Sequence, residues 1–206
     1  MTPLKLFADR YCRPDKTMQI FIQTEFYIVL VTACFLIDLR WVLAWFTAAF
    51  LHEIFHYLAL RLRNQQIFSL QIGALGAKME TMPLSAANEL ICALAGPLGG
   101  VLCLLFSDIF PRLAVCGFIQ STFNLLPVYP MDGGRVVKSL CQIFFPAICR
   151  KLCNGIQQTV YILLLLFGIY ASFVLRLGCL PVAIPAVMML KGKIKIPCKL
   201  HREQVE

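Results

Sequence analysis

Two histidines and a glutamate share one short stretch of an otherwise apolar segment. His52, Glu53 and His56 form the pattern H-E-x-x-H within LHEIFHYL. Residues four apart on a helix project from one face, so both imidazoles can bind one zinc ion while Glu53 approaches it as a general base. A chance match is the alternative. The apolar surroundings weaken this alternative, because imidazoles and a carboxylate cost free energy in a membrane helix and are retained there mainly for function.

A catalytic zinc site normally takes three protein ligands, so a third is expected from another part of the chain. Asp132 is the candidate, because it follows an apolar stretch broken by Pro127 and Pro130. Within a membrane, non-helical chain is tolerated only inside protein or beside a water-filled cavity. The alternative is that D-G-G is an ordinary turn. Asn124, on the helix leading to Asp132, is a candidate for binding a substrate backbone, and a structural amide between helices is an equal alternative.

The elements that must position these residues are membrane helices. The chain has 206 residues, of which 59% are hydrophobic and 15% charged, and its mean hydropathy is +0.75. This is too apolar for a soluble domain of that length. We therefore predict an all-α polytopic membrane protein of about six transmembrane helices, at 24–37, 41–60, 87–107, 113–131, 157–175 and 177–190.

The basic residues indicate how these spans are oriented. With six spans, 16 of the 19 Lys and Arg lie on one side of the membrane, leaving Arg40, Arg112 and Arg176 on the other. The positive-inside rule then places both termini of this multi-pass cell-membrane protein in the cytoplasm. The formal charge of +8 does not indicate a nucleic-acid partner, because the basic residues are spread over short loops without a recognisable binding motif.

Two short segments have the pattern of strands. MQIFIQ (18–23) is a predicted strand, and 67–82 has alternating positions around Gly73 and Gly76, which is the pattern of a hairpin. We expect this β element on the cytoplasmic side, where a strand edge can receive an extended peptide. The predicted organisation is a cytoplasmic segment over 1–23, a membrane domain over 24–190 and a basic cytoplasmic tail over 191–206.

The remaining cysteines and glycines are assigned to packing. The ten cysteines include no C-x-x-C pair, so we expect neither a disulfide framework nor a metal site at Cys149 and Cys153. Gly96, Gly99 and Gly100 are interpreted as close-packing positions within the membrane.

The motifs together resemble the site-2 protease family of intramembrane zinc metalloproteases. The residues that carry the resemblance are His52, Glu53 and His56 in HEIFH, and Asn124, Pro127 and Asp132 in FNLLPVYPMDGGR. AGPLGG (95–100) is similar to the family's small-residue helix start, and the resemblance covers roughly residues 18–145. Within the family, the sequence is most similar to the stage IV sporulation protein FB branch of Gram-positive bacteria.

The resemblance implies a zinc metalloendopeptidase that acts in regulated intramembrane proteolysis. It implies zinc ligation by His52, His56 and Asp132, with Glu53 as the catalytic base. The implied partners are the lipid bilayer, a membrane-associated protein or peptide substrate such as a sporulation sigma-factor precursor, and a regulatory membrane partner. There is no PDZ insertion, and the 16 residues after 190 leave no room for the CBS module of that branch, so we expect regulation without either.

Two other classes of protein are alternatives. A metal transporter needs polar groups that continue to the outer face, and segments such as VLCLLF offer almost none. A non-proteolytic membrane scaffold is expected to lose part of the H-E-x-x-H and Asp132 set, which is complete here.

Overall fold

The chain folds into helices with one small sheet, and the computed structural model describes residues 19–73, 76–129 and 131–174. In order, the elements are β1 (Gln19–Ile22), α2 (Thr24–Leu36), α3 (Leu39–Leu62), β2 (Ile67–Gly73), β3 (Gly76–Thr81), α4 (Ala86–Leu102), the 3-10 turn η1 (Cys103–Phe106), α5 (Pro111–Asn124), α6 (Asp132–Phe144) and α7 (Cys149–Phe173).

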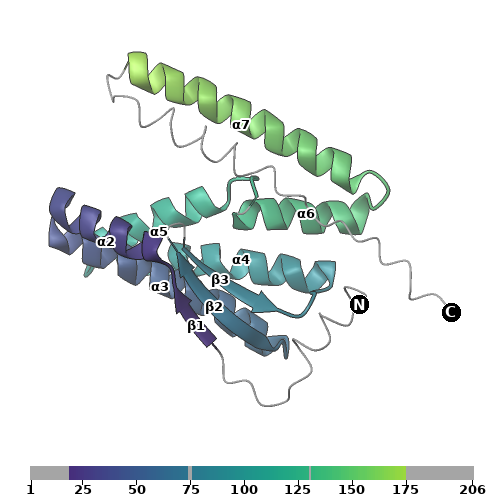
Figure 1. Cartoon of the computed structure of the whole chain (residues 1–206), viewed down its shortest axis with the longest axis horizontal. Coiled ribbons are helices and arrows are strands. Elements are labelled where there is room, and N and C mark those ends of the chain that lie inside the picture. Colours follow the sequence, from purple (N-terminus) through teal and green to yellow (C-terminus); the bar gives the residue numbers. More distant parts are fainter. Residues whose placement is uncertain (1–18, 74–75, 130, 175–206) are drawn as a thin grey trace.

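Helix α3 is the long helix that carries His52 and His56. It begins after Asp38, whose side chain accepts a hydrogen bond from the Arg40 amide at 2.7 Å, and it ends before Asn64, which has a φ of 53°. An N-terminal aspartate cap and a left-handed residue just past the end are common boundaries of a helix. Helix α3 packs against α4 and α5, α4 packs against α6, and α7 lies along α6 (Figure 1).

The sheet has the order β1-β2-β3, with β1 parallel and β3 antiparallel to β2 (Figure 1). Ile67 and Met79 pack against the buried Ala59, Leu60 and Cys92, so one face of the hairpin is fixed on α3 and α4. The strands predicted near 18–23 and 67–82 are therefore present, and β1 and β3 form the two edges of this sheet.

Three helices in the described residues are long and apolar enough to cross a membrane: Leu39–Leu62, Ala86–Phe106 and Cys149–Phe173. Helix α2 is apolar but has only 13 residues. These helices mark a membrane protein, whereas the predicted count of six spans is not confirmed. The sixth predicted span, 177–190, lies outside the described residues, as do 1–18 and the predicted tail 191–206.

The helix predicted over 113–131 is shorter in the structure. Helix α5 ends at Asn124, residues 125–129 are not helical, and α6 begins at Asp132. Pro127 has no backbone donor and disfavours a helical residue before it, which explains the break. The break matters for the site, because it allows α6 to start beside α3.

Candidate metal centre

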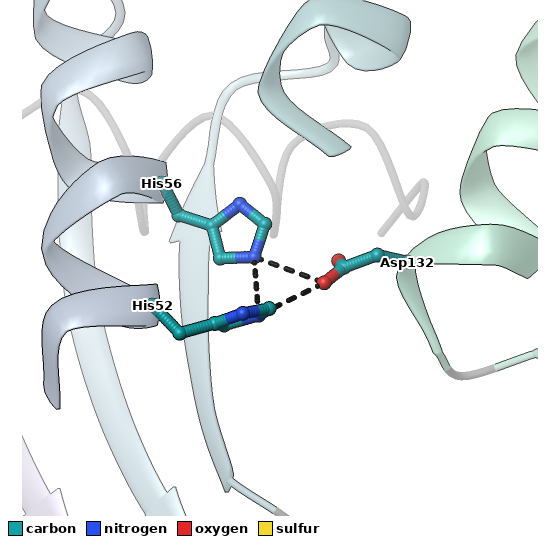
Figure 2. A group of neighbouring side chains, drawn as sticks. All are labelled: His52, His56 and Asp132. Atoms are coloured by element: carbon teal, nitrogen blue, oxygen red, sulfur yellow. Dashed lines mark hydrogen bonds and ion pairs between the residues drawn. The ribbon is translucent and has the colours of Figure 1, made fainter. Parts of the chain in front are cut away.

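Three ligand atoms from two helices meet inside the protein. His52 and His56 project from one face of α3, and Asp132 lies in the first turn of α6 (Figure 2). Asp132 Oδ2 is 3.1 Å from His52 Nε2 and 3.0 Å from His56 Nε2, and the two Nε2 atoms are 3.1 Å apart. All three residues are buried. The structure thus brings together the three residues that the sequence proposed as ligands.

The hydrogen-bond chemistry of His56 fits a cation at this point. His56 Nδ1 lies 2.7 Å from the Cys92 carbonyl oxygen, which can only accept, so Nδ1 must carry a proton. In the neutral ring, Nε2 then turns a lone pair toward the Asp132 carboxylate. Two acceptors this close repel each other unless a cation lies between them. Tetrahedral zinc, with ligands at about 2.0–2.1 Å, places ligand atoms about 3.3 Å apart, close to the separations here.

Space for such an ion depends on Gly96 of α4. A Cβ atom at Gly96 would lie 2.2 Å from His56 Nε2 and 2.7 Å from His52 Nε2. Because glycine has only a hydrogen there, a space remains directly beside both ligand nitrogens, and we call this space the cradle. The donor set, its geometry and this cradle all fit zinc.

Asp132 reaches the histidines because the start of α6 packs tightly on the preceding turn. A Cβ atom at Gly133 would lie 2.1 Å from the Leu125 carbonyl oxygen, and one at Gly134 would lie 2.6 Å from the Tyr129 nitrogen. The two glycines after Asp132 therefore let the first turn of α6 rest on the backbone of 125–129. The D-G-G sequence thus forms the start of α6, and its glycines allow that start to contact the preceding loop.

Glu53 lies on α3 next to His52 and reaches the sheet. Its Oε1 accepts a hydrogen bond from the Ala77 amide at 3.2 Å, at the start of β3. Ala77 is paired opposite Ile72, and its amide points away from β2, so Glu53 lies at the outer edge of β3. The Glu53 carboxylate, which follows His52 in the chain, thus contacts the edge of the sheet.

Asn124 ends α5 beside the ligand cluster. Its Nδ2 is 3.3 Å from His52 Nε2, so the amide touches a ligand nitrogen directly. The His52 Nδ1 atom is buried and has no hydrogen-bond partner among the described residues. Among the described residues, His52 Nδ1 therefore has no counterpart of the Cys92 carbonyl, which accepts from His56 Nδ1.

Two contributions to this site were not predicted from the sequence. Arg135 was counted only as a basic loop residue, yet its Nη1 donates to Asp132 Oδ1 at 3.2 Å. Its spacing of three residues from Asp132 on a helix was the available signal. Gly96 was assigned to general packing, as were Gly99 and Gly100. Gly99 does pack against Phe55 and Gly100 against Ser121, whereas Gly96 lies next to the two histidines.

Two comparisons of the sequence with known proteins find matches. Residues 94–168 match the model of peptidase family M50, and the matched part contains Asn124 and Asp132. A zinc metalloprotease of Methanocaldococcus jannaschii is 29% identical over 142 residues, covering 60% of this chain. The chain matches 41% of the length of that relative.

The fold also has a solved counterpart. The structure of a site-2 protease from Methanocaldococcus jannaschii superimposes with a TM-score of 0.60 and 20% identity, covering 94% of this chain and 98% of that one. At this identity the likeness shows the fold. The matches thus relate this chain in sequence to peptidase family M50 and to a zinc metalloprotease, and in fold to a site-2 protease.

Proposed function

We propose that this chain is an intramembrane zinc metalloprotease that hydrolyses peptide bonds of membrane-associated proteins. The observation that carries the proposal is the meeting of His52 Nε2, His56 Nε2 and Asp132 Oδ2 within 3.1 Å. The two histidines lie on α3, a helix apolar enough to cross a membrane. The likeness to peptidase family M50 supports it.

In this proposal His52, His56 and Asp132 hold the zinc ion. When bound, zinc supplies an electrophile that polarises the scissile carbonyl and acidifies the attacking water. Glu53 accepts the proton from that water and passes it to the leaving amine. Burial of the three ligands keeps bulk water away from them, and the Cys92 carbonyl holds the His56 ring in the required tautomer.

The substrate is proposed to bind as an extended chain. A peptide bond within a helix has its backbone groups paired, so the substrate must unwind before cleavage. The outer edge of β3 passes Glu53 at Ala77 and offers backbone groups for strand addition. Asn124, whose amide lies at the ligand cluster, is proposed to bind the substrate backbone.

The finer assignments remain predictions from the sequence. They are membership of the stage IV sporulation protein FB branch and a sigma-factor precursor as substrate. Both termini are predicted to be cytoplasmic.

Replacing Glu53 with Gln tests the proposed chemistry. The Glu53→Gln variant keeps its shape and its three ligands, so it should retain one zinc per chain. Cleavage should fall by about 10²-fold to 10⁴-fold, because the amide cannot accept the proton. The measurement compares membranes that contain the wild type or the variant, using mass spectrometry to find peptide termini that form only with the wild type.

The same experiment names the substrate class from the sequences around the new termini. Zinc content of the purified proteins, measured by metal analysis, is the control for an intact site. Cleavage by Glu53→Gln at the wild-type rate would show that Glu53 is not the base. If the purified wild type contained no zinc, the proposal of a zinc metalloprotease would be wrong.

A further inference from the structure

A chain of ion pairs connects Asp132 to helix α4. Arg135 Nη1 is 3.2 Å from Asp132 Oδ1, and Arg135 Nε is 3.9 Å from Glu89 Oε1. Lys138 Nζ is 3.1 Å from Glu89 Oε2. Glu89 lies in the first turn of α4, whereas Arg135 and Lys138 lie on α6. All four side chains are at most 28% exposed, so these pairs are partly shielded from water.

Asp132 needs an external restraint because of its place in the helix. The first N–H groups of a helix lack partners within it, and an aspartate at the start commonly turns back to accept from them. The residue before α6, Met131, provides no side-chain cap. Asp132 nevertheless directs Oδ2 at the two histidines. Its other oxygen, Oδ1, is held by Arg135, which opposes rotation toward the helix end.

Glu89 in turn restrains Arg135. A long arginine side chain three residues from its partner retains many rotamers, and pairs of this kind contribute little by themselves. The guanidinium presents several donors in a rigid plane, so it can contact carboxylates from two helices at once. Glu89 provides the second contact from α4. Lys138 contacts Glu89 and, among the described residues, not Asp132, so it joins these ion pairs only at Glu89.

We propose that Arg135, anchored by Glu89, is a positioning residue that holds the Asp132 carboxylate in its ligating orientation. The inference rests on the proposed metal centre and adds a link from that centre to α4. It predicts that zinc affinity depends on Arg135, although Arg135 does not touch the metal.

Electrostatics alone predicts the opposite effect. Removing a cation near a bound Zn²⁺ reduces repulsion and should strengthen metal binding. Weaker binding after loss of Arg135 therefore reports lost positioning. Lys138→Gln is the matched control, because it removes one positive charge one turn further along α6 and spares the contact with Asp132.

The test titrates zinc into the metal-free full-length protein in lipid nanodiscs, in competition with a chromophoric chelator. Arg135→Gln should lower zinc affinity by about 10-fold to 100-fold, the usual cost of losing a group that orients a ligand. Lys138→Gln should leave the affinity unchanged or raise it. Arg135→Lys, which keeps the charge but cannot span both carboxylates, should also weaken binding and serves if Arg135→Gln does not fold.

Two further measurements separate positioning from a general structural role. With cobalt(II) as the metal, the visible spectrum of Arg135→Gln should move toward that of Asp132→Ala, because both alter the same ligand. Glu89→Gln alone should weaken zinc binding. In the Arg135→Gln background it should lower zinc affinity by less than about a further threefold, because Glu89 acts on Asp132 through Arg135.

The outcomes distinguish the two proposals. Wild-type zinc affinity and an unchanged cobalt spectrum in Arg135→Gln would overturn the positioning role and leave the metal centre in place. The same holds if Lys138→Gln weakens binding as much as Arg135→Gln. If Asp132→Ala binds zinc as tightly as the wild type, the proposed metal centre itself is wrong.

Discussion

The ligand cluster depends on a missing methyl group at one residue of α4. The Cys92 carbonyl holds the His56 ring from one side, so the ring cannot withdraw easily from an atom placed at Gly96. The alanine Cβ would lie 2.2 Å from His56 Nε2, well inside normal contact. Helix propensity acts in the other direction, because alanine is favoured over glycine within a helix by about 1 kcal/mol.

We therefore expect Gly96→Ala to fold and to bind zinc poorly. Its zinc affinity should fall by more than about tenfold, since the ligands must move apart, whereas its helix content should remain. The chelator competition and circular dichroism measure these two quantities. Gly155→Ala is the control, because a Cβ at Gly155 of α7 meets nothing within 4 Å. Wild-type affinity in Gly96→Ala would show that the cradle is not where the ion binds.

At the scale of elements, α4 and α5 cross with their backbones in contact. A Cβ at Gly100 would lie 2.1 Å from Ser121 Oγ and 2.7 Å from the Gly117 carbonyl oxygen. Ser121 also donates to the Pro97 carbonyl at 2.9 Å. Small residues at such a crossing allow close approach of helices within a membrane. The crossing also sets the position of Asn124, which ends α5 at the ligand cluster.

Gly100→Ala should force α4 and α5 apart. Overpacking of this kind typically lowers the free energy of unfolding by about 1–3 kcal/mol. Denaturant titration in mild detergent, followed by circular dichroism, measures the change, and Gly155→Ala again provides the reference for a glycine in open space. Unfolding at the same denaturant concentration as Gly155→Ala would contradict a tight crossing at Gly100.

At the scale of the whole molecule, the helices present large apolar side chains outward. Phe35, Leu105 and Phe173 are 86%, 76% and 82% exposed. Surfaces of this kind are stable against lipid and are rare on soluble monomers. The buried polar cluster at α3 and α6 therefore lies inside a protein whose outer surface suits a bilayer.

The arrangement of basic residues predicts that both termini face the cytoplasm. Tags placed at each end should resist protease in intact spheroplasts and become sensitive after lysis, because the positive-inside rule keeps both ends on the inner side. A periplasmic tag on a second membrane protein controls for protease activity. Cleavage of either terminal tag in intact spheroplasts would contradict the predicted topology.

Much of the site could be predicted from sequence because its spacing is local. A helix places residues four apart on one face, so His52 and His56 were expected to act together as soon as α3 was recognised as a helix. The strands near 18–23 and 67–82 were also recognisable from alternation and glycines. The break at Pro127 was recognised, but the span was drawn to residue 131, because an apolar run does not by itself show where the helix stops before the proline.

By itself, the sequence determined which residue types were available and how neighbours on one helix are spaced, because helix geometry is the same wherever a helix forms. The tertiary structure alone decided which atoms meet. Asp132 reaches His56 across 76 residues of chain. The Cys92 carbonyl selects the His56 tautomer, Gly96 leaves the cradle, and Glu89 holds Arg135. Such contacts depend on how α3, α4 and α6 pack, and no local spacing specifies that packing.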